Sequence, residues 1–458
     1  MLIPVVAFQG SGQKTQTYIR VEARKKMGPE TPYMVYDTRM VDNLAGYHPS
    51  GKAEQLSKYG GLLNKREPAT GFFHVKKIGD RWWGIDPEGC LYVNMAINSI
   101  SPGGSERNQK ALADKYGTRE NWMQETLKML VENGFNCAGS WSDYKAVIEA
   151  NKATGKHFAY TINLNFMSSY GKERGGTFQQ PGHTGYPADA IFVFDPKWEE
   201  FCDRHAMKIE ANKNDPDLFG YFSDNELPFR LKSLDNYLSL PDQDPGRLAA
   251  ETWIKQNGVH RDSITDAHRK AFIRVVADRY FSLIARALKK YDPNHMYIGA
   301  RFYSSEKNIP EFMMTAGKYL DIVSNNYYGK WTPDSTDMAL WAKWTGKPFI
   351  ITEYYTKGED SGMPNTSGAG WIVKTQRDRG LFYQNYNLAL LESKNCVGWH
   401  YFKYQDNDPT ATGVDPSNTD SNKGIVNNYF EVWTPMMELM KELNCQVYDV
   451  IEYFEKKR

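Results

Sequence analysis

At 458 residues the chain can bury a large core, and 41% of it is hydrophobic with no apolar run near 18 residues, which indicates a globular protein without a membrane span. A formal charge of +1 gives no electrostatic reason to expect nucleic acid or an anionic membrane as partner. The five cysteines are odd in number and widely spaced, which argues against a disulfide framework.

The N-terminal part differs in composition from the rest. Met1–Phe8 lack the basic segment and the long apolar stretch of a signal peptide, so they do not indicate the cellular compartment. Thr17–Ala23 alternates like a strand, and residues 72–85 predict a β-hairpin around Gly79-Asp80. We therefore expect residues 1–88 to form a small β-rich extension that packs on the following domain.

From residue 89 onward, eight short β-rich runs alternate with amphipathic helices. The predicted strands are Leu91–Ile97, Phe135–Gly139, His157–Asn163, Leu218–Phe222, Met296–Phe302, Leu320–Ser324, Pro348–Thr352 and Val397–Phe402. The clearest predicted helices are Asn121–Asn133, Lys197–Lys213, Ala267–Lys290, Gln376–Ser393 and Pro435–Leu443. Serial strand–helix units indicate parallel strands, and eight of them close a (β/α)₈ barrel over residues 89–458. An open doubly wound sheet is the alternative.

The predicted loops have unequal lengths at the two ends of the strands. Helix-to-strand connections are short, whereas four strand-to-helix connections are long, namely Phe166–Asp195, Asn225–Asp266, Tyr354–Ala369 and Tyr404–Asn428. The long set emerges at the carboxyl face of the barrel, where such barrels place their active sites.

Two of the predicted strands, the fourth and the seventh, end in a glutamate. Gly220–Phe222 leads into Ser223-Asp224-Asn225-Glu226, and Pro348–Thr352 leads directly into Glu353. These strands lie on roughly opposite walls of a barrel, so both carboxyls should face its axis. A retaining glycosidase needs such a pair ~5–5.5 Å apart, one to attack the sugar and one to protonate the leaving oxygen.

A single glutamate at a strand end is most often an ion-pair or cap residue, but a pair at strands four and seven favours catalysis. Other chemistries have little support. The sequence contains neither His-x-His nor His-Glu-x-x-His, and no Gly-x-Ser-x-Gly, so we expect no metal and no other cofactor.

At these residues the sequence resembles a known clan. Asn225-Glu226 and Glu353 resemble the signature of the (β/α)₈ retaining glycosidases, which include β-galactosidases, β-glucuronidases and cellulases. Residues 321–329 resemble that clan's sixth strand, where a Tyr hydrogen-bonds the nucleophile, and Tyr327 is the better match. Trp399 resembles the Trp that forms the floor of the subsite for the cleaved sugar.

Within the clan, residues 71–89 with Asn98-Ser99 look most like the β-agarases of glycoside hydrolase family 50. This resemblance implies a retaining hydrolase of agarose-like galactan, a polysaccharide or oligosaccharide partner, and a periplasmic or secreted location. We expect two departures from the family: no counterpart of its large N-terminal carbohydrate-binding domain, and agarose-contacting loops that do not match residue by residue.

Roles for the site residues follow from the chemistry. Glu353 must be ionised to attack, so we expect donors such as Tyr327 and Arg301 to keep its pKa low. Glu226 must carry a proton at first, as the acid/base. Asn225 would donate to the sugar 2-hydroxyl.

Three more residues are candidate substrate contacts. Trp399 and Trp141 could stack on sugar faces, although Trp141 is equally consistent with a plain rim aromatic. His183, in a glycine-rich loop, is the third candidate, and a solvated loop position is its more ordinary interpretation.

Alternative functions stay open at this point. One is a β-galactosidase or β-glucuronidase acting on other β-glycans, and another is a non-catalytic carbohydrate-binding barrel. A binding module would need neither glutamate, so the presence of both speaks against it. Linkage and endo or exo mode are left undetermined.

Overall fold

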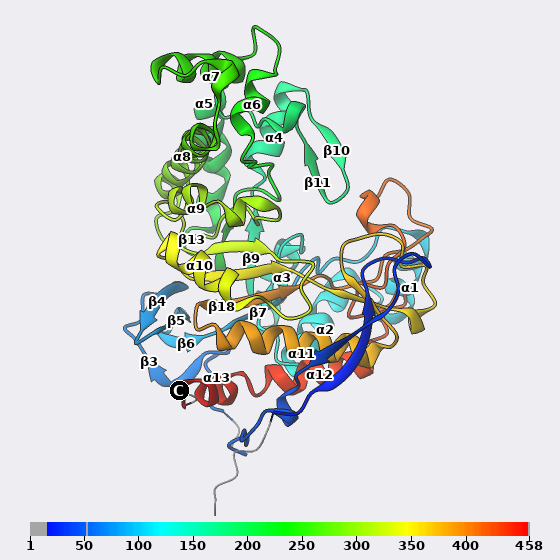
Figure 1. Cartoon of the computed structure of the whole chain (residues 1–458). Helices are drawn as coiled ribbons and strands as arrows, with labels where there is room; N and C mark the ends of the chain where they lie inside the picture. Colours follow the sequence, from blue (N-terminus) through cyan, green and yellow to red (C-terminus); the bar gives the residue numbers. More distant parts are fainter. Residues whose placement is uncertain (1–15, 52–53, 457–458) are drawn as a thin grey trace, which may run out of the picture.

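The computed structural model describes residues 16–51 and 54–456 of the chain (Figure 1). Met1–Phe8, which the sequence analysis weighed as a signal peptide, lie outside these residues.

Eight parallel strands form the central sheet. They are β7 (Asn94–Ile97), β8 (Cys137–Ala138), β9 (Ala159–Asn163), β12 (Leu218–Phe222), β13 (Met296–Tyr297), β14 (Val323–Asn326), β15 (Phe349–Glu353) and β18 (Cys396–Tyr401). Each strand pairs with the next except β13 with β14, and β18 returns to β7. Between β13 and β14 a parallel bridge joins Phe302 to Asn325, with Phe302 N–H donating to the Ser324 carbonyl at 2.9 Å. The predicted (β/α)₈ barrel is confirmed, and the open sheet is excluded.

The helices lie between the barrel strands in the sequence or follow the last of them. They are α1 (Glu106–Tyr116), α2 (Arg119–Glu132), α3 (Tyr144–Thr154), α4 (Phe166–Arg174), α5 (Trp198–Ala206), α6 (Ser233–Leu238), α7 (Pro245–Gln256), α8 (Asp266–Tyr291), α9 (Pro310–Ala316), α10 (Ser335–Thr345), α11 (Gln376–Glu392), α12 (Thr434–Asn444) and α13 (Val447–Lys456). Side chains cap the first turn of several helices. At the start of α11, for example, the Thr375 hydroxyl accepts a hydrogen bond from the Asp378 N–H. Helix α11 lies between the barrel and the helices α12 and α13 (Figure 1).

The predicted N-terminal hairpin is present and covers the amino end of the barrel. Strands β4 (His74–Ile78) and β5 (Arg81–Ile85) pair antiparallel, in a sheet ordered β3 (Leu62–Arg66), β6 (Cys90–Tyr92), β5, β4. Phe73 and Tyr92 from this part of the chain pack in one cluster with inward-facing residues of the barrel strands, such as Phe219. This apolar plug closes the barrel at the end opposite the long loops.

A second small sheet joins the N-terminal part to the loop after β15. Strands β1 (Ile19–Arg24) and β2 (Met34–Thr38) continue a sheet with β16 (Thr356–Gly358) and β17 (Trp371–Val373). The division into an extension of residues 1–88 and a barrel of residues 89–458 stays a prediction. Strands β5 and β6 pair across that boundary.

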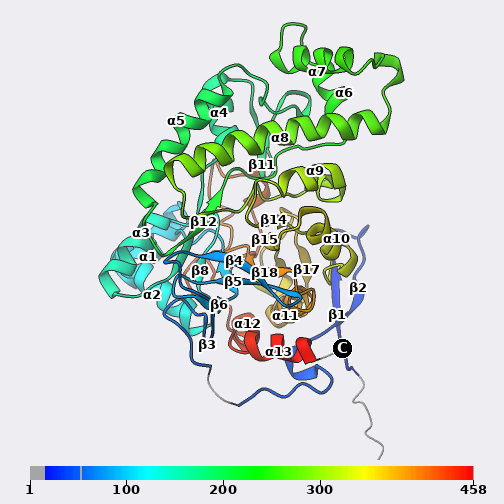
Figure 2. The ribbon, with the colours of Figure 1, turned by 90° about the vertical axis from the view of Figure 1, so that its left-hand side faces the viewer.

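The long loops at the carboxyl face carry structure of their own. The loop after β9 contains α4 and a hairpin of β10 (Phe178–Gln180) and β11 (His183–Gly185). The loop after β12, predicted as a long connection, contains α6 and α7, and Asp244 and Pro245 provide the cap and first residue of α7. In Figures 1 and 2 these helices extend beyond the barrel, together with one end of α8.

Candidate active site

Glu226 stands on a strained turn after β12. Its φ is 53°, in the left-handed region that non-glycine residues seldom adopt. The backbone holds it there, since Glu226 N–H donates to the Ala300 carbonyl at 3.2 Å. The buried Asp224 carboxylate, two residues earlier, accepts from Met167 N–H at 2.9 Å and from the Tyr280 hydroxyl at 2.7 Å. The turn is therefore tied to the segment after β13, to the start of α4 and to α8.

Glu353 is the last residue of β15, and two donors hold its carboxylate. Arg301 donates from Nη2 to Oε2 at 2.5 Å, and the Tyr328 hydroxyl donates to Oε1 at 2.7 Å. Arg301 is fully buried and, like Glu226, has a positive φ of 53°. A buried guanidinium fixes the orientation of a carboxylate because its donors are planar.

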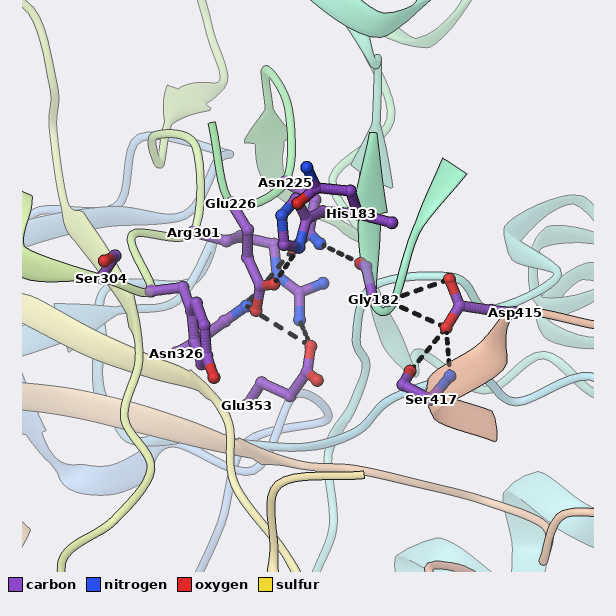
Figure 3. A network of polar contacts seen from close by, with 12 residues as sticks. Gly182, His183, Asn225, Glu226, Arg301, Ser304, Asn326, Glu353, Asp415 and Ser417 are labelled. Atoms are coloured by element: carbon purple, nitrogen blue, oxygen red, sulfur yellow. Dashed lines mark hydrogen bonds and ion pairs between the residues drawn. The ribbon is translucent and has the colours of Figure 1, made fainter. Parts of the chain in front are cut away.

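Asn326, at the end of β14, connects the two glutamates (Figure 3). Its Nδ2 donates to Oε1 of Glu226 at 2.8 Å and lies 3.4 Å from Oε2 of Glu353. The Thr352 hydroxyl donates to the Asn326 Oδ1 at 2.8 Å, which sets the orientation of the amide. One side chain therefore positions both carboxyls.

Burial raises the pKa of Glu353 to about 7, because water is largely excluded from its carboxyl. The charge of Arg301 acts in the opposite direction, the nearby Glu226 raises the pKa further, and the hydrogen bond from Tyr328 lowers it. The expectation that donors keep the pKa of Glu353 low is wrong for this structure. The donors are present, but burial outweighs them.

Three of the predicted contact residues lie beside the glutamates in one pocket. The Asn225 Nδ2 donates to the Gly182 carbonyl at 3.2 Å, and the Nδ1 of His183 is 3.5 Å from Oε2 of Glu226 (Figure 3). Trp141 is 42% exposed, and the Arg301 guanidinium lies 5.7 Å from the centre of its ring. All three residues line the pocket, and the ring of Trp141 is available to a ligand.

The prediction that Tyr327 bonds Glu353 is wrong. Its hydroxyl donates to Asp337 at 2.6 Å, and the neighbouring Tyr328 bonds Glu353 instead. Side chains alternate along a strand, so Asn326 faces the axis, Tyr327 faces α10, and Tyr328 faces the axis again.

Trp399 is also misassigned by the sequence analysis. It is fully buried and donates from Nε1 to the Tyr383 hydroxyl on α11 at 2.8 Å, so it packs on the outside of the barrel. His400 faces inward against Phe222. By the same alternation Phe402 faces inward as well, and it is Phe402 that lines the pocket.

The pocket itself has a volume of about 570 Å³. Besides the two glutamates, Asn225, His183 and Trp141, its lining includes Tyr303, Tyr328, Tyr355, Phe402, Lys403, Asp415 and Lys423. Gly182, at the tip of the β10–β11 hairpin, donates its N–H to both oxygens of Asp415, at 2.9 and 3.0 Å. The loops after β9 and β18 thus meet above the glutamates (Figure 3).

Among the residues that the structure describes, no group of three or more His, Cys, Asp or Glu is placed to hold a metal ion. In the same residues no helix combines the length and apolarity needed to cross a membrane.

No family model matches the chain. Two curated relatives from Vibrio sp. (strain JT0107) do: Beta-agarase B is 24% identical over 86% of this chain, and Beta-agarase A is 25% identical over 78%. The chain spans 50% of the length of the first and 40% of the second.

Solved structures give a closer match. The agarase AgWH50C superposes with a TM-score of 0.70 at 23% identity, over 87% of this chain and 67% of its own, which shows a shared fold. BpGH50 superposes with a TM-score of 0.85 and covers 99% of both chains. Because it is also 31% identical in sequence over that length, this chain belongs to glycoside hydrolase family 50.

Proposed function

We propose that the chain is a retaining glycosidase that hydrolyses β-linked galactan of the agarose type by double displacement. The contact that carries this proposal is the amide of Asn326, which lies 2.8 Å from an oxygen of Glu226 and 3.4 Å from one of Glu353. Those two oxygens can be no farther apart than the sum of these distances. That upper limit is below the ~6.5–9.5 Å separation of inverting pairs, which supports the retaining arrangement.

In the first step, an oxygen of Glu353 bonds to the anomeric carbon while the bond to the leaving oxygen breaks, and Glu226 gives its proton to that oxygen. In the second step, Glu226 takes a proton from water, whose oxygen attacks the anomeric carbon and releases Glu353. Arg301 and Tyr328 stabilise the Glu353 carboxylate before attack and after release. Asn225 would donate to the sugar 2-hydroxyl in both transition states.

The substrate class rests on the relatives and on the pocket walls. The curated relatives are named beta-agarases, and agarose is a β-linked galactan. Trp141 and Tyr303 line the pocket and are 42% and 38% exposed, so their rings are available to the apolar faces of pyranose sugars.

A product screen tests this function directly. The protein is incubated with agarose, agaro-oligosaccharides and an aryl β-galactoside, and products are followed by reducing-sugar assay and mass spectrometry. We expect release of short neutral oligosaccharides from the galactans. Hydrolysis of the aryl glycoside alone would favour a β-galactosidase, and no hydrolysis of any substrate would favour a binding barrel.

The retaining course predicts the anomer of the first product. Two successive inversions at the anomeric carbon return it to the β configuration. Proton NMR in the first minutes of hydrolysis should therefore show the β-anomer, with the α-anomer growing later by mutarotation. Early α-product would mean inversion and would contradict double displacement.

The two adjacent tyrosines provide a matched pair of variants. Tyr328→Phe removes a hydrogen bond to a charged carboxylate, worth about 1.5–3 kcal/mol, so kcat/KM should fall roughly 10–100-fold. Tyr327→Phe removes the partly buried hydrogen bond to Asp337 and should mainly lower the free energy of unfolding, by about 1–3 kcal/mol. Kinetics and urea unfolding of both variants check this. A loss of kcat/KM in Tyr327→Phe but not in Tyr328→Phe would mean that Tyr327, not Tyr328, serves the nucleophile.

A further inference from the structure

Three lysine ammonium groups gather behind one wall of the pocket. Lys403 follows Phe402 at the end of the last barrel strand, Lys423 lies in the same long loop, and Lys357 belongs to β16. The backbone pairs the first two, since Lys403 N–H donates to the Lys423 carbonyl at 3.1 Å. Both Lys403 and Lys423 line the pocket that holds Glu226 and Glu353.

The three ammonium groups differ in their partners. Lys357 donates to the carbonyls of Asn365, Ser367 and Gly368 at 2.9–3.2 Å, which uses all of its protons. Lys423 donates to the carbonyl of Ser417 and to the Oδ1 of Asn418, which leaves one proton. The ammonium of Lys403 has a weak contact, 6.0 Å from the ring centre of Phe402, and no hydrogen bond within the described part of the chain.

None of these ammonium groups lies within 4.0 Å of a carboxylate among the described residues. The nearby acidic groups are engaged elsewhere. Asp415 accepts from the Gly182 N–H and from Gln179. Asp406 accepts from the Gly424 N–H at 2.7 Å and from Trp433 at 2.9 Å. The positive charges of this wall are therefore left without a close counter-ion.

Such an arrangement is unfavourable in the free protein. Like charges repel strongly where water is scarce, and burial disfavours the charged form of each amine. Burial lowers the pKa of Lys403 to about 8, and burial with the charges of Lys403 and Lys357 lowers the pKa of Lys423 well below its usual range. The ring of Phe402, 5.5 Å from the Lys423 ammonium, offsets only part of this cost.

We infer that Lys403 and Lys423 form a subsite for an oxyanionic substituent, a sulfate ester or a carboxylate, on the galactan substrate. This inference rests on the proposed function and names its substrate class more closely. An oxyanion would supply the missing counter-ion and accept the unused protons of both amines. The subsite is near the reacting carbon, because Lys423 lies 4.8 Å from the ring of Tyr355, which packs against Tyr328.

Because the subsite acts through charged amines, its preference for an anionic substrate should depend on pH. Only the protonated amine attracts an oxyanion, so the preference for an anionic substrate should be present below pH 8 and decline as the pH rises through about 8, the pKa of Lys403. The other charged groups that act on the two lysines are Lys357, Glu353, Asp406 and Asp415.

The test compares a sulfated galactan oligosaccharide, its desulfated counterpart and a uronate-bearing oligosaccharide. The measured quantity is the ratio of kcat/KM for each anionic substrate to that for the neutral one. In Lys403→Met this ratio should fall about 10–100-fold for the anion that the subsite accepts, because a charged hydrogen bond is lost. Lys403→Arg should retain most of it. The control is Lys394→Met. Lys394 pairs with Asp80 at the other end of the barrel, so its loss should leave the ratio unchanged.

Calorimetry with Glu353→Gln separates this inference from the proposed function. The same oligosaccharides are titrated at pH 7 and pH 9 in buffers of different ionisation enthalpy, and the anionic ones should bind more tightly at pH 7 with proton uptake. If no galactan is hydrolysed, the proposed function fails, and binding still reports on the lysines. Equal binding of neutral and anionic oligosaccharides, or equal losses on both in Lys403→Met, would show that the lysines serve hydroxyl groups and would overturn the inference. Should Lys403→Met not fold, the wild-type pH profile and Lys403→Arg decide.

Discussion

Glu353→Ala should lower kcat/KM on every glycoside by roughly 10⁴–10⁶-fold, because no other group can form the glycosyl-enzyme bond. The loss should not depend on how good the leaving group is, since attack on the anomeric carbon fails in each case. The variant should stay folded. Glu353 is the last residue of β15 and its side chain lines the pocket, so water that enters the vacated space can solvate the Arg301 guanidinium that loses its partner.

Azide adds a stereochemical readout to this variant. With an activated aryl glycoside, azide can enter the space left by the carboxylate and attack from the same side, giving an α-glycosyl azide. Glu359→Ala is the matched control, because Glu359 follows the same strand but pairs with Arg24 and Lys374 outside the pocket. Its kcat/KM should stay within about threefold of wild type, a change below ~0.7 kcal/mol. Full activity in Glu353→Ala would remove Glu353 from the mechanism.

The barrel could be predicted from sequence because each strand is a short apolar run between helical segments. Leu218–Phe222 was predicted with the bounds that β12 has, since all five residues are buried and the runs on both sides are polar. Prediction of β13 was less accurate. Its regular part ends at Tyr297, and the chain rejoins the barrel only through the bridge at Phe302. Local pattern does not reveal such an interruption.

The positions of Glu226 and Glu353 at the pocket could also be predicted, because Glu226 lies on the turn after β12 and Glu353 ends β15. The neighbours of the glutamates were harder. The choice of Tyr327 over Tyr328, and of Trp399 over Phe402, depends on which face of the strand points inward. A shift of one residue reverses the answer. Side chains of every second residue face the axis, so counting from an inward-facing residue on each strand would have identified Tyr328 and Phe402.

Contacts between distant loops are a different limit. Asp415 meets Gly182 across 233 residues of sequence, and Lys403 meets Lys423 because two stretches of one loop pair through their backbones. Neither loop has a periodic pattern, so the sequence gives no sign of which residues face each other. Asn326 was missed for a related reason, as an amide at a strand end is ordinary until both glutamates are seen beside it.

Glu226→Ala should affect substrates unequally, and this distinguishes an acid/base from a nucleophile. Natural galactans have alkoxide leaving groups that need a proton, so their hydrolysis should fall about 10²–10⁴-fold. An aryl glycoside with an acidic phenol needs little protonation, so the glycosyl-enzyme should still form. It should then accumulate, because water lacks the base that activates it. A burst of phenol followed by slow turnover is the expected trace, and mass spectrometry should find the sugar attached to Glu353.

Azide should relieve this block, since it attacks without losing a proton. It approaches the glycosyl-enzyme from the side that Glu226 serves, so the product should be a β-glycosyl azide, the opposite anomer to that from Glu353→Ala. Asn326 contacts both glutamates and so cannot itself distinguish their roles, whereas the anomer of the azide can. If the two variants gave the anomers in the reverse order, Glu226 would be the nucleophile and Glu353 the acid/base. If azide changed neither variant, and Glu226→Ala showed neither a burst of phenol nor a sugar attached to Glu353, the double displacement that the proximity of the carboxyls supports would be contradicted.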